Sequence, residues 1–278
     1  MLQAVNQRFP QSPLHILEVG AGIGTMIERL MDWDVIPGEA HLTAIEPDFH
    51  SLAEAIDRIN QYAIRHQYIQ EPSATPELDL DIPGRPMSIN FQTADLESFS
   101  RNYAGPQRFN LVIAHAVLDL LNIPDALSAI LSLTAENGLL YFTINFDGMT
   151  ILEPAIDAAL DRQIEELYHQ TMDRRVTNGK PSGDRYTGRH LFQHLRGRNI
   201  TILAAGSSDW VVCASPNGYV QDEEYFLHFI VNTMAGALDH HPELDQARFA
   251  AWIEERHRQI ERGELVYIAH QIDILAQR

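Results

Sequence analysis

The feature that most constrains this chain is its segment from Leu14 to Thr25, which has the sequence LHILEVGAGIGT. The first six residues are mostly apolar and partly β-branched, which is typical of a strand buried on both faces. Gly20, Gly22 and Gly24 follow this strand at every second position, and residues 25–31 have helical character. The segment is therefore predicted to be a strand, a tight glycine turn and a helix.

Such a turn has a specific chemical use. Glycine tolerates positive φ angles and lets the backbone come close to a ligand. The helix that follows directs free N–H groups and the positive end of its dipole towards an anionic group. The turn therefore predicts a cofactor site. An ordinary strand-to-helix turn without a ligand is the alternative, because short glycine motifs recur by chance.

The next part of the chain predicts a regular alternation of strands and helices. Strands are expected at 41–45, 87–92, 109–114 and 139–144, and helices at 48–64 and 124–133. The proline-rich and acidic residues 70–86 are expected to be a surface insertion. Alternation of this kind specifies an α/β fold, with a doubly wound parallel sheet that has helices on both faces.

Together with the strand at 14–19, these make five predicted strands, and a polar residue lies at or just after the end of each. The five are Glu18, Glu46, Asp95, His115 and Asp147, and residues 145–148 are expected to end the fifth strand. In a parallel sheet of this type, ligands bind outside the carboxyl ends of the strands. The five side chains are therefore expected to meet at one edge of the sheet and to form a site there.

The alternation is interrupted between residues 149 and 188. An amphipathic helix is predicted for residues 153–172, followed by a polar loop over residues 177–188. We expect this segment to be a cap over an acceptor site, with a peripheral helical hairpin as the alternative. The segment and its end are locally basic, through Arg174, Arg175, Lys180, Arg185 and Arg189. These side chains either meet an anionic acceptor or balance neighbouring acidic residues.

The alternation then resumes and closes the chain as a single domain covering residues 1–278. A helix is predicted at 187–196, a sixth strand at 199–205, two helices at 221–238 and 244–262, and a last strand at 264–276. Asp209 and Trp210 follow the sixth strand, so they are expected beside the acceptor site.

The motif Glu18-x-Gly20-x-Gly22-x-Gly24 resembles motif I of the class I S-adenosylmethionine-dependent methyltransferases. The dinucleotide fingerprint G-x-G-x-x-G has one more residue between its last two glycines. From residue 14 to about residue 144 the resemblance rests on sequence motifs. From there to the C-terminus it rests only on the predicted order of the strands. It implies seven mostly parallel strands, an antiparallel last strand and a helical cap after strand five.

The resemblance also implies S-adenosylmethionine as cofactor and S-adenosylhomocysteine as product. Glu46 would hold the ribose, Asp95 and Leu96 the adenine, and His115 would lie near the amino acid end. The implied cofactor-binding residues are Glu18, Gly20, Ala21, Gly22, Gly24, Glu46, Pro47, Asp95, Leu96, His115 and Ala116. Asp95 is equally well placed to cap a helix, and the two roles are compatible.

Methyl transfer requires alignment of the acceptor and, for some acceptors, removal of a proton. The candidate catalytic residues are His115, Asp147 and Asp209, and the sequence does not choose among them. His115 is equally consistent with a packed, non-catalytic side chain. Trp210 and Tyr186 are candidate walls for a flat or apolar acceptor, although aromatic side chains more often belong to a core.

Composition limits the partners and the compartment. The formal net charge of −18 disfavours nucleic acid, whose phosphates are bound by lysine and arginine. Cys213 is the only cysteine, so an intrachain disulfide is excluded and a reducing, cytoplasmic location is expected. No signal peptide is predicted, and no apolar run of about 18 residues predicts a membrane span. Pro242 interrupts the spacing of His240, His241 and Glu243, so no metal site is expected.

The sequence therefore predicts a methyltransferase that acts on a small-molecule acceptor. Two alternatives stay open: an oxidoreductase with a nicotinamide cofactor, and a regulatory protein that binds S-adenosylmethionine without turnover. The short glycine spacing and Glu18 count against the oxidoreductase. The identity of the acceptor, the acceptor atom and the formation of a homodimer are left open.

Overall fold

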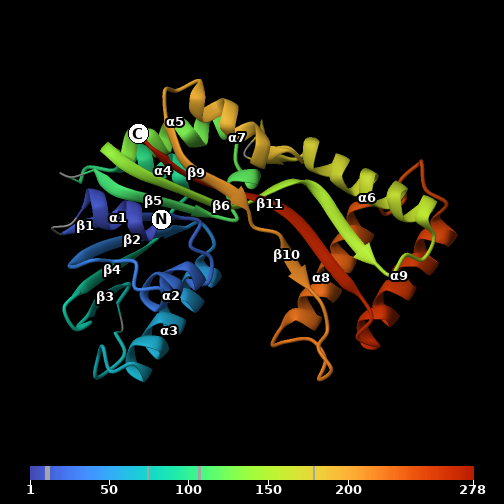
Figure 1. Cartoon of the computed structure of the whole chain (residues 1–278), viewed down its shortest axis with the longest axis horizontal. Coiled ribbons are helices and arrows are strands. Elements are labelled where there is room, and N and C mark those ends of the chain that lie inside the picture. The colour runs from blue at the N-terminus through green and yellow to red at the C-terminus, as the bar shows by residue number, and fades with distance from the viewer. Residues whose placement is uncertain (10–12, 74, 106–107, 178) are drawn as a thin grey trace.

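Two long strands run through most of the molecule and connect its two lobes (Figure 1). They are β6 (Thr134–Glu153) and β11 (Val266–Gln277), which pair antiparallel with each other. The computed structural model describes residues 1–9, 13–73, 75–105, 108–177 and 179–278. We call the part with the parallel strands the sheet lobe. The part formed by α6, α8, α9, β10 and the adjoining ends of β6 and β11 is called the helical lobe.

Within the described residues, the main sheet has nine strands. Besides β6 and β11, these are β1 (Leu14–Val19), β2 (Ala40–Glu46), β3 (Glu77–Leu80), β4 (Met87–Thr93), β5 (Phe109–His115), β9 (Thr201–Ser207) and β10 (Trp210–Val212). The strands β4, β2, β1, β5 and β6 are parallel neighbours in that order. The antiparallel strand β11 pairs with β6, β9 and β10. All seven predicted strands are present, and the antiparallel last strand is confirmed.

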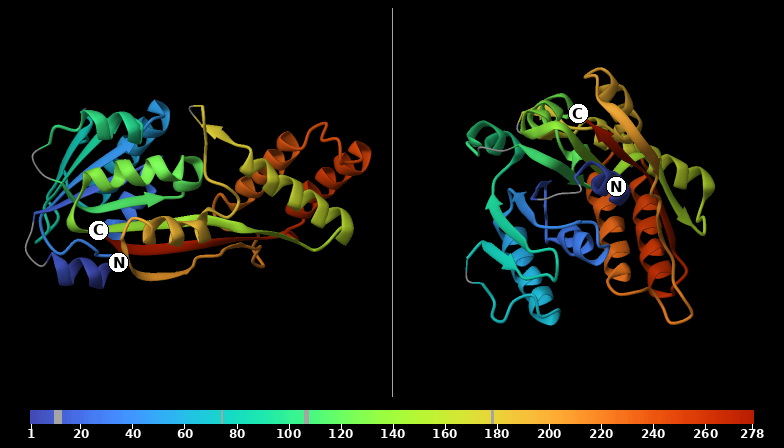
Figure 2. Two further views of the ribbon diagram at one scale, coloured as in Figure 1. Left: turned by 90° about the horizontal axis from the view of Figure 1, so that it is seen from above. Right: turned by 60° about the vertical axis from the view of Figure 1, so that its left-hand side comes forward.

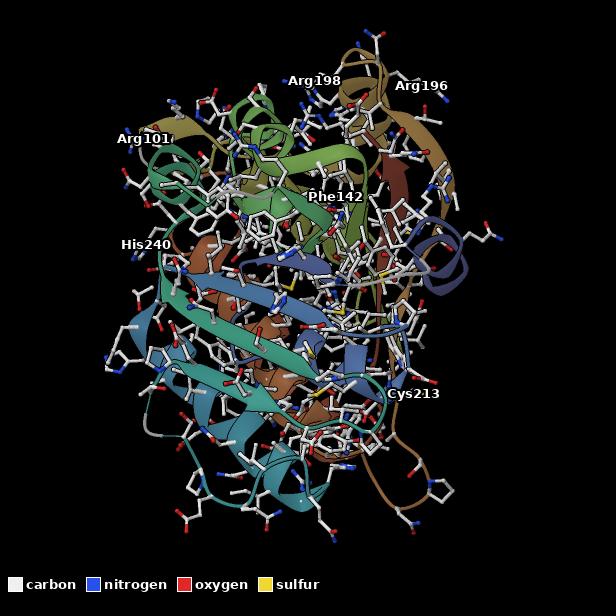
Figure 3. The ribbon with its side chains drawn as sticks, turned by 90° about the vertical axis from the view of Figure 1, so that its left-hand side faces the viewer. Arg101, Phe142, Arg196, Arg198, Cys213 and His240 are labelled. Carbon is white, nitrogen blue, oxygen red and sulfur yellow. The ribbon has the colours of Figure 1, made fainter. Side chains whose placement is uncertain are left out.

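The helices of the sheet lobe cover both faces of the sheet. They are α1 (Leu2–Arg8), α2 (Thr25–Asp32), α3 (Phe49–Arg65), α4 (Leu96–Asn102), α5 (Ile123–Leu133) and α7 (Thr187–Arg196), with a short 3₁₀ helix η1 (Leu118–Leu120). Side chains of α2 and α3 form one core cluster with the sheet, and side chains of α4, α5 and α7 form another. Phe142, labelled in Figure 3, belongs to the second cluster.

Strand β1 shows why the opening segment must be buried on both faces. Leu14 and Ile16 belong to the cluster under α2 and α3, whereas Leu17 and Val19 belong to the cluster under α4 and α5. A strand that contributes to two cores has to be apolar at nearly every position, as the sequence predicts. The two exceptions within this strand are His15, which is half-buried, and Glu18, which is buried.

The helical lobe has a core of its own. Helices α6 (Ala158–Asp173), α8 (Glu223–Ala237) and α9 (Gln246–Glu261) pack against the far ends of β6 and β11 and against β10. Figure 2 shows these helices beside the extended ends of the two long strands, away from the parallel strands. Trp252 of α9 is only 1% exposed and lies in this core. The lobe is therefore a packed unit rather than a loose cap.

Three local expectations differ from the structure, and strand pairing explains all of them. Residues 70–86 contain β3, which adds an edge strand because Leu78 and Leu80 alternate inward. The strand expected from residue 139 begins at Thr134, and its register against β5 shifts between Thr134 and Leu139. Strand β6 does not end at residues 145–148 but continues to Glu153, because β11 pairs with it along this length.

The longer strand also moves the boundaries of the predicted cap. The helix expected from residue 153 begins at Ala158, and Asp157 caps it by accepting from the N–H groups of Ala159 and Leu160. The segment 149–188 therefore contains the end of β6, then α6, and then the hairpin of β7 (Val176–Thr177) and β8 (Lys180–Pro181). The first residues of α7 complete it. Among the helices described, none combines the length and apolar character that a bilayer crossing needs.

Candidate functional site

The glycine turn between β1 and α2 is held in a left-handed backbone conformation. Gly20 and Gly22 have φ angles of +69° and +52°. The N–H groups of Gly20 and Ala21 both donate to the carbonyl of Ile45 in β2. A Cβ atom on Gly20 would lie 2.7 Å from Val117, whereas one on Gly22 would meet nothing within 4 Å. The turn is therefore tight on the protein side and open on the other, which leaves room for a ligand above Gly22.

Glu46 ties the end of β2 to this turn. Its Oε2 atom accepts from the N–H of Gly22 at 2.9 Å, and its Oε1 atom accepts from the N–H of Asp48 at 3.0 Å. Asp48 in turn caps α3 by accepting from the N–H of Ser51. A carboxylate oxygen has two lone pairs, so each oxygen of Glu46 keeps capacity for one further donor.

Glu18 lies beneath the turn and has no compensating partner. It is 1% exposed, and its Oε2 atom has no hydrogen-bond partner in the part of the chain that the structure describes. Its neighbours in the sheet are Ala44 and Ile113. Burial without a counter-charge raises the pKa of Glu18 to about 8. A cationic group placed over the turn would offset the cost of ionising this carboxyl.

Asp95 and Leu96 lie at the end of β4, where α4 begins. Asp95 caps α4 by accepting from the N–H of Ser98 at 2.8 Å, while Leu96 is buried. Both residues line a small cavity of about 90 Å³ whose wall also includes Thr177 and Lys180 of the β7–β8 hairpin. The predicted cap segment thus reaches the sheet edge beside Asp95.

A larger cavity of about 510 Å³ opens at the end of β5 and beside the middle of β6. Its wall includes the end of β5 with His115 and Ala116, and the end of α2 with Arg29 and Trp33. Asp209, which precedes β10, and Trp210, its first residue, complete this wall. Residues of both lobes therefore meet in this cavity. Because β1 and β5 are neighbours, the cavity begins beside the glycine turn.

His115 is held against the neighbouring strand. Its Nδ1 atom lies 2.7 Å from the hydroxyl of Thr143 on β6. Burial lowers the pKa of His115, and the nearby charge of Arg29 lowers it further. Both effects favour the neutral imidazole, which is the form that can accept a proton.

The structure brings Asp147 and Asp209 together around His270, which the sequence analysis did not select. The Nδ1 atom of His270 lies 2.7 Å from Asp209, and its Nε2 atom lies 3.8 Å from Asp147. Arg189 donates from Nε and Nη2 to both carboxylate oxygens of Asp147, at 2.9–3.0 Å. Asp209 lines the larger cavity, whereas Asp147 is buried and saturated by Arg189.

Other cavity residues escaped the sequence analysis, among them Arg29, Trp33, Gln271 and Asp273. Asp273 accepts from the N–H of Ile144 and from the hydroxyl of Ser208. Polar side chains at alternate positions of an otherwise apolar last strand were an available signal, because alternate residues share a face. Tyr186 packs on Gly148 with Arg189 over its ring, so it contributes to the α7 contact instead.

The order of the strands decides the fold. Five parallel strands run from β4 to β6, and the antiparallel β11 lies between β6 and β9. The chain has the class I methyltransferase fold. In this fold, the glycine turn, Glu46, Asp95 and the exit of β5 lie at the carboxyl edge of the sheet.

Comparisons with known proteins do not narrow the function. No protein-family model matches the chain, and no curated protein sequence matches it. Among solved structures, a putative methyltransferase from Bacillus halodurans has a TM-score of 0.49 and 11% identity, covering 99% of this chain and 97% of that one. A methyltransferase from Thiobacillus denitrificans in complex with S-adenosylhomocysteine has a TM-score of 0.48 and 13% identity, covering 100% and 90%.

A cyclopropane synthase from Mycobacterium tuberculosis has a TM-score of 0.48 and 11% identity, covering 99% of this chain and 82% of its own. These values are too low for any of the three proteins to indicate an acceptor for this chain. Among the described residues, no three histidine, cysteine or acidic side chains are grouped as metal ligands would be.

Proposed function

We propose that this protein is an S-adenosylmethionine-dependent methyltransferase that acts on a small molecule bound in the larger cavity. The observation that carries the proposal is the buried carboxyl of Glu18, which has an unpartnered oxygen beneath an open glycine turn. A buried polar group without a partner is costly, so it indicates a ligand that compensates it. The amino group of the methionine part of the cofactor carries the required positive charge.

The remaining residues of the sheet edge fit the same ligand. Gly20, Ala21 and Gly22 form the open turn on which the cofactor would lie, and Glu46 keeps acceptor capacity for the ribose hydroxyls. Asp95 and Leu96, with the exposed Pro47 after β2, would hold the adenine. Gly24 has a φ angle of +80° and caps α2, so its part is to start the helix behind the turn. His115 and Ala116 would lie at the amino acid end, where the larger cavity begins.

Bound S-adenosylmethionine supplies a methyl group that its sulfonium already activates. The chain's own residues then align the acceptor and exclude water, which contributes about 7–11 kcal/mol when alignment is good. Where the acceptor carries a proton, His115 and Asp209 are the candidates to take it, because both line the cavity. Asp147 is less suited to this role, since Arg189 occupies both of its oxygens.

Calorimetric titration tests the cofactor assignment. We expect the protein to bind S-adenosylmethionine and S-adenosylhomocysteine at micromolar concentrations and not to bind NAD(P)H. The Glu46→Ala variant should bind both at least tenfold more weakly, as loss of a hydrogen bond to a charged group costs about 1.5–3 kcal/mol. Glu39→Ala is the matched control, because Glu39 is an exposed acid just before β2. Binding of NAD(P)H alone would instead favour the oxidoreductase.

A second assay tests the acceptor class. The protein would be incubated with S-adenosylmethionine labelled in its methyl group, and with fractions of small metabolites, protein or RNA. We expect label to appear in the small-molecule fraction only. A folded protein that binds the cofactor and labels no fraction would favour the regulatory alternative. A cytoplasmic location and a homodimer stay predictions, which fractionation of cells and light scattering would test.

A further inference from the structure

The larger cavity is bordered by two tryptophans that the protein leaves partly exposed. Trp33 is 46% exposed and Trp210 is 41% exposed, and both line the cavity. Trp252, the third tryptophan of the chain, is 1% exposed in the helical core. Trp33 directly follows α2 of the sheet lobe, and Trp210 begins β10 of the helical lobe (Figure 1). The cavity therefore has an indole from each side of the junction between the lobes.

The ring of Trp210 is fixed in orientation by two aromatic neighbours. Phe226 of α8 stacks on it with ring centroids 4.1 Å apart and an angle of 27° between the planes. Tyr267 of β11 meets it edge-on at 6.5 Å and 88°. One face of the indole is thus covered by Phe226, so its exposed area belongs mainly to the rest of the ring. A ring held in this way is a preformed flat wall that loses little conformational entropy when a ligand binds.

The polar groups of the cavity argue against a cationic occupant. The guanidinium of Arg29 lies 5.7 Å from the ring centroid of Trp33, where a ligand cation would otherwise bind. Within the described residues, Arg29 makes no ion pair with a carboxylate, so its charge stays uncompensated and repels cations. The two acids of the cavity already have hydrogen-bond partners, Asp209 in His270 and Asp273 in Ile144 and Ser208.

We propose that the methyl acceptor is an aromatic molecule whose ring packs against Trp210 and Trp33. This inference rests on the proposed function, because it names the class of molecule that the methyltransferase site would take. Aromatic rings gain from offset or edge-on packing beyond the area they bury, and two indoles border this cavity. Saturated rings and aliphatic chains gain only from the buried area.

Binding of 2-naphthol, a flat fluorescent phenol, tests the proposal without any need for turnover. We expect saturable binding, followed by fluorescence anisotropy in the presence of S-adenosylhomocysteine. Trp210→Ala and Trp33→Ala should each weaken binding about tenfold, and Trp210→Phe should retain most of it. Tyr225→Ala is the matched control, because Tyr225 is 73% exposed on α8 and does not line the cavity. The affinity of Tyr225→Ala for 2-naphthol should equal that of the unmodified protein.

Several outcomes would overturn the proposal. Unchanged 2-naphthol binding in both tryptophan variants would place the ring elsewhere. Equal affinity for decahydro-2-naphthol, the saturated analogue, would mean that the site selects apolar molecules in general. Displacement of 2-naphthol by choline would indicate a cation site. Affinity for S-adenosylhomocysteine and the melting temperature, measured on each variant, separate these results from misfolding. If the unmodified protein binds 2-naphthol but not S-adenosylhomocysteine, the proposed function fails and the aromatic site stands.

Discussion

Two buried carboxyl groups, one in the core of each lobe, are treated in opposite ways. Asp161 in the helical lobe is 6% exposed and accepts from the side chains of Arg256 and Trp252, at 2.9 and 2.5 Å. The N–H groups of residues 156 and 157 also donate to it. Glu18 in the sheet lobe is 1% exposed and has an oxygen without any donor among the residues described.

The difference separates a structural charge from a functional one. Asp161 is neutralised inside its own lobe, where Arg256 is fully buried and also donates to the carbonyl of Pro154. This network joins α6 and α9 to the end of β6 and supplies the counter-charge of Asp161 from the protein itself, although the Nε atom of Arg256 has no partner among the described residues. Glu18 lies under the open turn, where a ligand is the only remaining source of compensation. Buried charge by itself therefore does not mark a site, whereas buried charge without a partner does.

The largest effect is expected when the self-contained network is broken. Asp161→Ala should lower the free energy of unfolding by about 5 kcal/mol, because it leaves Arg256 charged, buried and unpaired. Urea denaturation at pH 7 measures the change. Asp245→Ala is the control, since Asp245 accepts from two backbone N–H groups as the exposed cap of α9. It should cost about 1 kcal/mol. Equal losses of unfolding free energy in the two variants would mean that the buried ion pair stabilises the fold no more than an exposed helix cap does.

Removing the unpartnered carboxyl should have a smaller effect, and one that depends on pH. The unfolded chain releases the Glu18 proton near pH 4.5, whereas the folded protein holds it up to about pH 8. The folded state thus binds more protons between these values, and the free energy of unfolding falls as pH rises through them. Between pH 5 and pH 8.5 this loss is about 4 kcal/mol.

The Glu18→Gln variant should lack this loss, so without cofactor it should be more stable than the unmodified protein at pH 8.5. Urea denaturation at the two pH values measures the difference. Glu39→Gln, which changes an exposed acid, should behave like the unmodified protein. Parallel pH dependence in Glu18→Gln and the unmodified protein would show that Glu18 is already compensated.

The two lobes also differ in how far the sequence predicts them. In the sheet lobe, the central strands β1, β2 and β5 contribute to two cores, so their apolar runs and the turns after them are visible in the sequence. The glycine turn, Glu46 and Asp95 were therefore placed correctly at the edge of the sheet. Their proposed contacts with a cofactor remain predictions.

The helical lobe depends on pairing between distant segments, which a single sequence does not display. Residues 145–153 continue as a strand because β11 lies beside them, more than 100 residues away along the chain. For the same reason Asp209 and Asp147 were selected separately, and His270, which lies between them, was not selected. Trp33 was missed because it follows a helix whose cavity-facing side is defined only by the packing of the second lobe.

A third and smaller effect is expected in the pH dependence of cofactor binding, which tests whether Glu18 lacks a partner in the free protein. If a cationic group compensates Glu18, binding at pH 7 should release a proton from this carboxyl. Affinity for S-adenosylmethionine should then rise by up to about tenfold per pH unit below pH 8, which is about 1.4 kcal/mol. Calorimetry in two buffers with different ionisation enthalpies counts the protons. The plot of log affinity against pH should be shallower in Glu18→Gln, by up to one proton released, and unchanged in Asp245→Ala. An equal slope in all three proteins would show that Glu18 is not linked to cofactor binding.

The smallest effect is expected at an exposed ion pair between the β7–β8 hairpin and α5. Lys180 of the β7–β8 hairpin lies 2.6 Å from Asp125 of α5, and the two side chains are 53% and 56% exposed. Exposed pairs contribute little, and the hairpin is also held where Asn122 donates to the carbonyl of Pro181. Lys180→Ala should therefore leave the melting temperature unchanged. A marked loss of S-adenosylmethionine affinity in this variant, but not in Asn122→Ala, would show that the charge itself, rather than the anchoring of the hairpin, acts at the cavity beside Asp95.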